Sequence, residues 1–256
     1  MTENIETLLK ESRVYRPTAK TIAAAHIKDY EKEYQKSIAD PEAFWSGMAK
    51  ELDWFSPWST VLEWNYPWAK WFVGATCNIT YNCLDRHVKT WRKNKVALIW
   101  VGEDDRERIF TYGELYRQVN RCANALKKLG LNTGDRVTIY LPKIPEQLIA
   151  MLACARIGVI HSVVYSGFSA PALASRINDA ESKLVITADV GFDRTKVIPL
   201  KPIVDEALKQ CSSVERVVVV RRQPSSPLPT APKELDWTDW VKGEPAVCEA
   251  KPLDSE

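Results

Sequence analysis

Four short apolar segments, separated by three helical patterns, limit the fold of this chain more than any other feature of its sequence. The segments RVTIYL, VIHSVVY, KLVITA and RVVVV are rich in β-branched residues, as buried strands are. Strands in such an alternation are parallel, because each helical crossover returns the chain to the same edge of the sheet. We therefore predict an α/β fold, a parallel sheet of βαβ units with flanking helices, with strands at 136–141, 159–165, 183–188 and 216–220 and helices at 145–157, 170–180 and 200–211.

The residues before the first of these strands predict a hairpin and a capped helix. The strand-like segments VALIWVGE and ERIFTY flank a turn at Asp104-Asp105. Thr111 and Glu114 form a capping box, in which each side chain accepts from a backbone amide at the start of a helix. We expect this helix to close at Gly130 and assign residues 95–256 to one α/β part.

A helical and Trp-rich extension, residues 1–94, precedes this part. Six of the ten Trp residues lie between Trp45 and Trp71. Residues 53–76 mix aromatic residues with Pro, Ser and Gly, without a helical or strand period. We interpret them as an irregular segment whose rings pack on a neighbouring domain, with stacking on a ligand as the alternative. Helical patterns are predicted within residues 1–40, at 41–52 and at 78–92.

Charge and hydropathy exclude several classes of protein. The 35 basic and 33 acidic residues leave a net charge of +2, which argues against nucleic acid as a partner. The longest uncharged apolar run, residues 148–155, is far below the about 20 residues that a membrane span needs. The first ten residues lack the features of a signal peptide. The six cysteines have no zinc-site spacing and are interpreted as reduced and structural, so we predict a cytoplasmic chain with no metal site and no membrane partner.

Known catalytic motifs are missing from the sequence. It contains no G-x-G-x-x-G after a strand, no G-x-x-x-x-G-K-[ST], no G-x-S-x-G and no H-E-x-x-H. His26, His87 and His161 each stand alone in the sequence, and we interpret them as structural. No catalytic residue is therefore predicted in this chain.

Loops that follow the strands are the candidate binding sites, because ligands of parallel sheets bind beyond the carboxyl ends of the strands. The loops are residues 141–143, 165–168 and 189–196. In the second, an aromatic residue precedes small residues that allow a ligand to approach the backbone; the alternative is a plain turn with Ser169 as the cap of the next helix. In the third, two cations close together could dock a phosphate, and the alternative is a solvated loop. If the second and third loops lie at the same edge of the sheet, a nucleotide could bind both, with its aromatic base at one loop and its phosphates at the other.

Long strings of the chain resemble the AMP-forming acetyl-CoA synthetases of the adenylate-forming superfamily. The strings are AFWSGMAKELDWFSPWSTVLEW, WFVGATCNITYNCLDRHV, MLACARIGVIHSVVYSGFSAPALASRI and KLVITAD. The resemblance implies a ligase that converts acetate, ATP and CoA into acetyl-CoA through an acetyl-adenylate, with Mg²⁺ on the ATP. It also implies that residues 95–256 are the first part of a large AMP-binding domain. In the family, the phosphate loop, the acid pocket and the catalytic Lys lie further along, so the chain is expected to be the N-terminal part of a longer enzyme, cut at a loop and inactive alone.

The resemblance assigns six residues to the CoA site. Tyr165 stands where the family has an aromatic residue beside the CoA adenine, and Ser166 and Gly167 stand where Gly-Gly is usual. Arg194 and Lys196 fall in the loop that gives basic residues to the CoA phosphates, whereas Asp193 occupies a position where Arg is common. The departures at Ser166 and Asp193 imply weaker CoA binding, or a substitution of Arg194 for the missing cation.

Three alternatives stay open beside an acetate-specific enzyme. The acid could be propionate or another short carboxylate. The chain could be a non-catalytic module that binds CoA or a partner. A Rossmann dehydrogenase has only the βαβ pattern in its favour, without the glycine fingerprint.

Overall fold

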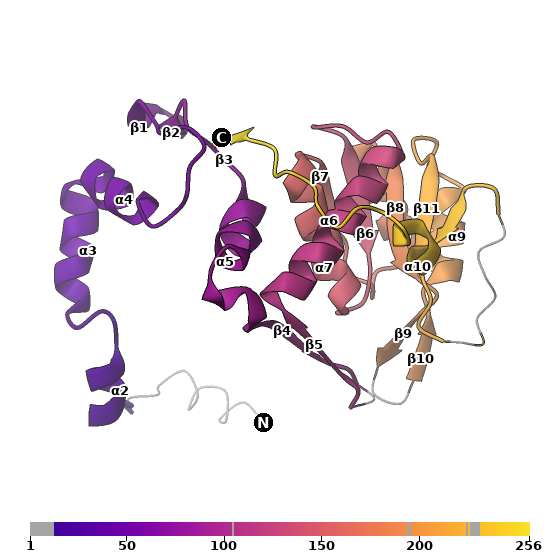
Figure 1. Ribbon diagram of the computed structural model, residues 1–256, viewed down its shortest axis with the longest axis horizontal. Coiled ribbons are helices and arrows are strands. Elements are labelled where there is room, and N and C mark those ends of the chain that lie inside the picture. The colour runs from indigo at the N-terminus through magenta and orange to yellow at the C-terminus, as the bar shows by residue number, and fades with distance from the viewer. Residues whose placement is uncertain (1–12, 104, 194–195, 224, 226–230) are drawn as a thin grey trace, which may run out of the picture. The chain divides into compact units, whose positions relative to one another are not determined.

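The computed structural model describes residues 13–103, 105–193, 196–223, 225 and 231–256 (Figure 1). The chain divides into two units, Met1–Glu51 and Leu52–Glu256. The first unit contains the helices α2 (Ala19–Ala24), α3 (Tyr30–Ala39) and α4 (Pro41–Ala49). Asp29 and Asp40 cap α3 and α4, since their side chains accept from the amides of Lys32 and Ala43. The predicted helix at 41–52 is thus confirmed from its first residue and ends three residues early.

A five-stranded sheet forms the centre of the second unit, and all of its strands are parallel. In spatial order the strands are β12 (Glu234–Asp236), β11 (Arg216–Val220), β8 (Leu184–Ala188), β6 (Arg136–Tyr140) and β7 (Ile160–Val163). The prediction of a parallel α/β sheet is confirmed, and the short edge strand β12 is an addition to it. Since β7 lies on one side of β6 and all later strands lie on the other, the chain changes direction across the sheet between β6 and β8. Such a switch point is where open parallel sheets bind ligands.

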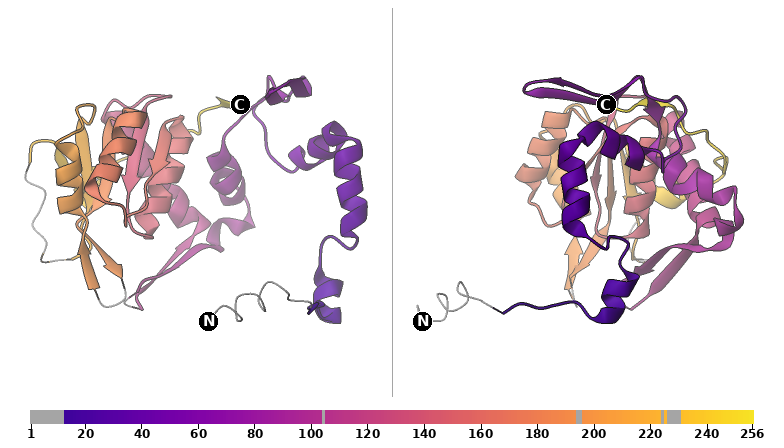
Figure 2. Two further views of the ribbon diagram at one scale, coloured as in Figure 1. Left: turned by 180° about the vertical axis from the view of Figure 1, so that it is seen from behind. Right: turned by 90° about the vertical axis from the view of Figure 1, so that its left-hand side faces the viewer.

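Helices cover both faces of the sheet. The helix α6 (Tyr112–Lys128) packs against α7 (Pro145–Ile157), and α8 (Ala170–Ala180) packs against α9 (Lys201–Leu208). Figures 1 and 2 show the two pairs on opposite faces. The bounds of α7 and α8 agree with the prediction, and the capping box of Thr111 and Glu114 opens α6 as expected. A short helix, α10 (Trp237–Val241), contacts α6 and β11. Among the described residues, every helix is too short or too polar to cross a membrane.

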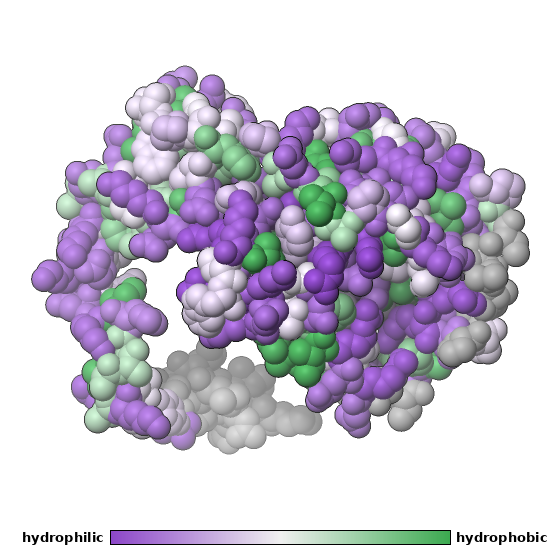
Figure 3. Space-filling model, viewed as in Figure 1, coloured by the Kyte–Doolittle hydropathy of each residue, from purple (hydrophilic) through white to green (hydrophobic). Residues whose placement is uncertain are grey.

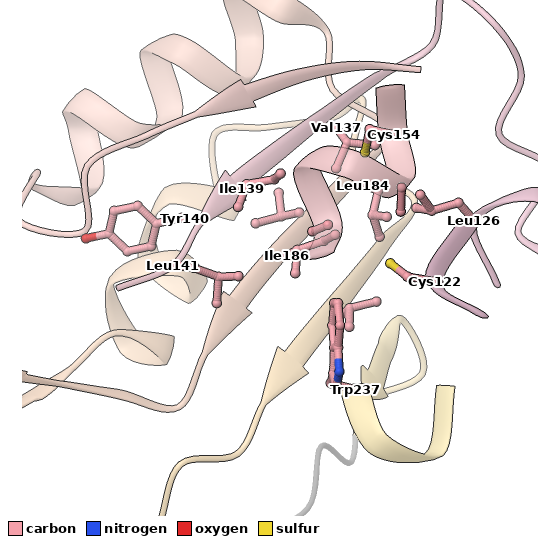
Figure 4. Packing of buried hydrophobic residues seen from close by; sticks show 14 of the residues in the cluster. Cys122, Leu126, Val137, Ile139, Tyr140, Leu141, Cys154, Leu184, Ile186 and Trp237 are labelled. Carbon is pink, nitrogen blue, oxygen red and sulfur yellow. The ribbon is translucent and has the colours of Figure 1, made fainter. Parts of the chain in front are cut away.

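The core lies between the sheet and these helices, and Figure 4 shows part of it. Ile139 and Ile186 are fully buried on the sheet, and every residue of β8 is buried. Each such aliphatic side chain contributes about 1.5–3 kcal/mol through its burial. Cys154 is also fully buried, and burial raises the pKa of its thiol to about 12. All six cysteines are free, and a thiol in this state behaves as a small apolar side chain.

Within the Trp-rich residues 53–76, residues 60–73 form a hairpin, so the prediction of an irregular segment is wrong for this part, whereas residues 53–59 are irregular as predicted. The strands β1 (Thr60–Asn65) and β2 (Trp68–Val73) are antiparallel, with Leu62 opposite Trp71 and Trp64 opposite Ala69. Apolar and polar residues occur on both faces of β1, and Trp68 and Phe72 place aromatic rings on the second face of β2, which hides the period of two that identifies a strand. The rings of Trp54, Trp58 and Phe72 lie 5.2–5.4 Å apart, so these aromatic residues pack on one another.

The helical pattern predicted at residues 78–92 is confirmed, with a π-helical insertion within residues 79–88 and a separate 3₁₀ helix at its end. Its parts are a π-helical turn η1 (Tyr81–Asp85), α5 (Arg86–Val88) and a 3₁₀ turn η2 (Trp91–Asn94). The side chain of Thr90 accepts from the amide of Arg92 and starts the last turn. Local bonds of this kind compete with a continuous helix.

A buried ion pair joins these turns to α7. Arg156 is fully buried and donates to both carboxylate oxygens of Asp85, at 2.7 and 2.8 Å. It also donates to the carbonyl of Cys248 at 2.6 Å and to the hydroxyl of Thr80 at 3.2 Å. Burial acts to lower the pKa of Arg156, but the hydrogen bond and charge of Asp85 outweigh it, and the pKa is raised. The guanidinium therefore stays charged and links three segments far apart in the sequence.

Residues near the end of the sequence are paired, although the chain is expected to be cut at a loop. The strand β13 (Leu253–Asp254) is antiparallel to β3 (Thr76–Cys77), as Figure 1 shows near the C-terminus. The amide of Lys251 donates to the carbonyl of Arg156, and the hydroxyl of Ser255 donates to the carbonyl of Phe72. Polar composition hid this strand, because only one of its two residues, Leu253, is apolar.

The predicted hairpin before α6 is confirmed as β4 (Val96–Val101) and β5 (Glu107–Thr111). Leu98 and Phe110 pack against the core, whereas Ile99, Val101 and Ile109 are more than half exposed. An apolar patch is visible over this hairpin in Figure 3.

The half-buried His161 of β7 makes stability depend on pH. Burial lowers its pKa below the ordinary value of 6.5, so the unfolded chain binds its proton more readily than the folded one. The contribution of His161 to stability is therefore lost as the pH falls below about 6.5. We expect the free energy of unfolding to decline less between pH 7.5 and 5 in a His161→Gln variant than in the wild type, as measured by urea denaturation. Parallel declines in the two proteins would contradict this.

Candidate ligand-binding site

A cavity of about 570 Å³ lies at the carboxyl ends of β6, β7 and β8, beside the switch point of the sheet. Its lining comes from the end of β4, from the loops after β6 and β7, from a hairpin after β8 and from the residue after β11. These are mainly residues 100–103, 142–144, 165–167 and 191–193, with Arg222. Loops far apart in the sequence thus meet at one edge of the sheet, as the parallel topology predicts.

The turn after β7 presents an aromatic ring over a glycine. The amide of Phe168 donates to the carbonyl of Tyr165 at 3.0 Å and closes the turn. A Cβ at Gly167 would lie 2.4 Å from the Tyr165 ring, so a larger residue there would displace the ring from this position. Tyr165 is 66% exposed, and its ring contacts that of Phe168 edge to face at 5.8 Å. An exposed ring beside a cavity is a surface on which a flat ligand can stack.

The buried Tyr140, at the end of β6, holds this turn from below. Its hydroxyl lies 2.9 Å from the carbonyl of Ser166 and 2.8 Å from that of Phe168. Figure 4 shows the hydroxyl at the end of the core, pointing away from it. Burial raises the pKa of Tyr140, which keeps the hydroxyl protonated and able to donate. Ser169 begins α8 as predicted, but its side chain makes no capping hydrogen bond.

The predicted loop after β8 is a hairpin. Its strands are β9 (Val190–Asp193) and β10 (Lys196–Pro199), with Asp193 directly opposite Lys196. Asp193 is exposed and lines the cavity, while Lys196 is exposed beside it but outside the lining. Opposite charges at facing positions attract each other across a hairpin. Arg194, the sixth predicted site residue, lies outside the described residues.

A buried carboxylate, which the sequence did not single out, joins the ends of β8 and β11. Asp189 accepts from the amide of Val190 at 2.7 Å, from that of Arg222 at 2.8 Å and from that of Gln223 at 3.1 Å. These bonds fix the backbone from which the Arg222 side chain starts. The Arg222 guanidinium lies 4.5 Å from the centre of the Phe192 ring, a cation–π contact between β11 and the hairpin.

Trp100 connects the β4–β5 hairpin to the cavity. Its indole N–H donates to the carbonyl of Lys143 at 2.7 Å. On the other side of Trp100 lies a second cavity of about 380 Å³, which shares Trp100, Ile144 and Arg222 with the first. The second cavity contains the ion pair between Arg108 and Glu146, at 2.7 Å.

Four of the six predicted site residues are therefore brought together in one cavity: Tyr165, Ser166, Gly167 and Asp193. The sequence missed Trp100 and Arg222, whereas Phe192 lies in the predicted loop 189–196. For Arg222 a signal existed, because it follows the valine run of β11 as the other loops follow their strands. For Trp100 there was none, since only the packed structure brings β4 to this edge.

The lining can recognise an anionic ligand with an aromatic group. Lys143 and Arg222 supply positive charge, and Tyr165 supplies a stacking face. Within the described residues, no group of three or more His, Cys, Asp or Glu side chains could hold a metal ion. The arrangement therefore points to binding, and no bond-making step is assigned to it.

Comparisons with known proteins find matches along nearly the whole chain. The profile of the AMP-binding enzyme family matches residues 84–255, and that of the acetyl-coenzyme A synthetase N-terminus matches residues 30–83. The acetyl-coenzyme A synthetase of Gemmatimonas aurantiaca is 48% identical over 259 residues, which cover 99% of this chain and 39% of that protein. That of Methanothrix thermoacetophila is 52% identical over 215 residues, covering 83% of this chain and 33% of the relative.

A solved structure shares the fold. The acetoacetyl-CoA synthetase from Streptomyces lividans superposes with a TM-score of 0.84 at 25% sequence identity, over 94% of this chain and 39% of that one. In each of these comparisons the chain spans no more than 39% of the length of its relative.

Proposed function

The chain belongs to the AMP-binding enzyme family, and from that premise we propose that it is the N-terminal part of an acetyl-coenzyme A synthetase. The complete enzyme would activate acetate with ATP to acetyl-adenylate and pyrophosphate. It would then transfer the acetyl group to the thiol of CoA and release AMP. The match to acetyl-coenzyme A synthetases over 99% of this chain is the observation that carries the proposal.

We assign the cavity at the sheet edge to the nucleotide end of CoA. Tyr165 would stack on the adenine, and Gly167 would let the ligand approach the backbone of the turn. Lys196, and Arg194 beyond the described residues, would supply positive charge near the phosphates. The negative charge of Asp193 would repel the phosphates and weaken this attraction.

ATP and Mg²⁺ are assigned to residues outside these 256. The described residues offer no cluster that fits a metal ion, so no step is built on one here. When bound, Mg²⁺ would stabilise charge on the phosphates of ATP. We propose the division into an extension, residues 1–94, and the first part of the AMP-binding domain, residues 95–256; the change of family profile at residues 83–84 supports a boundary in this region.

Acetate is the proposed acid because the similar proteins of Gemmatimonas and Methanothrix are named acetyl-coenzyme A synthetases. Propionate or another short carboxylate is the alternative. We place the protein in the cytoplasm, a location that six free cysteines support.

The first experiment is a calorimetric titration of the chain with CoA. We expect binding, and we expect Tyr165→Ala to weaken it about 5- to 100-fold, because stacking of a base on an aromatic ring contributes about 1–3 kcal/mol. Tyr66→Ala is the matched control, since Tyr66 is 82% exposed and lies outside the cavity. A flat titration with the wild type would overturn the CoA assignment.

The second experiment separates the ligase from a non-catalytic module. A ligase predicts acetate-dependent exchange of pyrophosphate into ATP by the intact polypeptide as isolated from its source. The 256-residue chain alone is expected to form no AMP from ATP and acetate. CoA binding without exchange in the intact polypeptide would favour the module.

A further inference from the structure

The cavity lacks the cation that the family resemblance implies at position 193. Asp193 brings a negative charge to the lining, and Glu103 brings a second. The basic residues of the lining, within the part of the chain that the structure describes, are Lys143 and Arg222. A phosphate that enters the cavity therefore meets positive charge from these two residues, at the ends of β6 and β11, in addition to that of Lys196 beside the cavity.

Arg222 is held in place by two independent contacts. Its amide donates to the buried Asp189 carboxylate at 2.8 Å, which fixes the start of the side chain. Its guanidinium stacks at 4.5 Å on Phe192, which fixes the other end. Stacking engages the face of the guanidinium, while the N–H donors lie in its plane, where they match phosphate oxygens. A cation ordered in this way loses little further freedom when a phosphate binds.

We propose that Arg222, assisted by Lys143, is the phosphate-binding residue of this cavity and replaces the cation missing at position 193. The proposal rests on the proposed CoA function and names the residue that recognises the charged part of the ligand. Lys143 is exposed and flexible, so it adds general attraction, whereas Arg222 provides a directed contact.

The test compares Arg222→Gln with Arg221→Gln, which changes the net charge equally. Arg221 is the neighbouring residue, pairs with Asp236 at 3.1 Å and lies outside the lining of the larger cavity. Affinities for CoA and for pantetheine, which has no phosphate, are measured by calorimetry. We expect Arg222→Gln to lower the affinity for CoA about 10- to 100-fold, since a charge-assisted hydrogen bond to phosphate is lost. The affinity for pantetheine should be unchanged. Arg221→Gln should change neither by more than about 3-fold.

Further variants exclude a purely structural role. Arg222→Lys should restore part of the CoA affinity, and Asp193→Arg should raise the affinity about 2- to 5-fold at low salt. If Arg222→Gln weakens CoA and pantetheine equally, Arg222 only holds the hairpin and the proposal is wrong. It is also wrong if the two Gln variants behave alike. Failure of the wild type to bind CoA would instead overturn the proposed function.

Discussion

Replacing Asp85 by Ala is expected to lower the free energy of unfolding by about 3–5 kcal/mol. The substitution leaves the Arg156 guanidinium fully buried without the carboxylate that accepts two of its hydrogen bonds. A buried charge without its partner costs more than the pair itself contributes. A domain is typically stable by about 5–15 kcal/mol, so the variant should unfold at much lower urea concentration, as followed by circular dichroism.

The control is Glu206→Ala, which removes an exposed ion pair with Lys209 on α9. Exposed pairs contribute about 0–1 kcal/mol, so this variant should be close to the wild type. The double variant Asp85→Leu with Arg156→Met should recover part of the loss, because no unpaired charge remains. Equal stability of the Asp85→Ala and Glu206→Ala variants would show that the buried pair does not stabilise the fold.

Gly158→Ala is the second substitution with a large expected effect, about 2–4 kcal/mol of lost stability. Gly158 ends α7 with a φ of +78°, a conformation that favours glycine. An added Cβ would also lie 2.8 Å from the Leu253 side chain and 2.9 Å from that of Thr133. Both neighbours would have to move, and Leu253 belongs to the strand that pairs with β3.

Gly130→Ala separates the two causes. Gly130 has a similar φ of +84°, but nothing lies within 4 Å of the position of its Cβ. Replacing Gly130 by Ala should lower the free energy of unfolding only by the cost of holding Ala in the left-handed conformation, about 1–2 kcal/mol. Thermal unfolding of both variants gives the comparison, and equal losses would contradict the steric contribution at Gly158.

The sheet and its helices could be predicted because their signals are local. In α7 and α8 a proline near the first turn marks the start of each helix, and the apolar runs of the strands lie between turn residues. The β1–β2 hairpin was missed because aromatic residues occupy both of its faces. The strand β13 was missed because it has only two residues, of which only Leu253 is apolar, and its partner β3 lies far away in the sequence.

The candidate site was half predictable for a similar reason. The rule that ligands bind beyond the carboxyl ends of strands located Tyr165 and Asp193. It could equally have located Arg222, had the end of β11 been treated like the others. Asp189 lies in a predicted loop, but its role depends on contacts with the distant Arg222 and Gln223, and no local pattern in the sequence identifies Trp100.

The closing of the chain by β13 also sets an order of events during synthesis. The hydroxyl of Ser255 donates to the carbonyl of Trp71, 184 residues earlier in the sequence. At roughly 5–20 residues per second, the ribosome needs about 10–40 s to make the residues between them. During that time β3 can pair with Ser56 but not with β13, and Arg156 can meet Asp85 well before the carbonyl of Cys248 exists. The five-stranded sheet, whose last strand ends at Asp236, can thus pair on the ribosome before the second partner of β3 emerges.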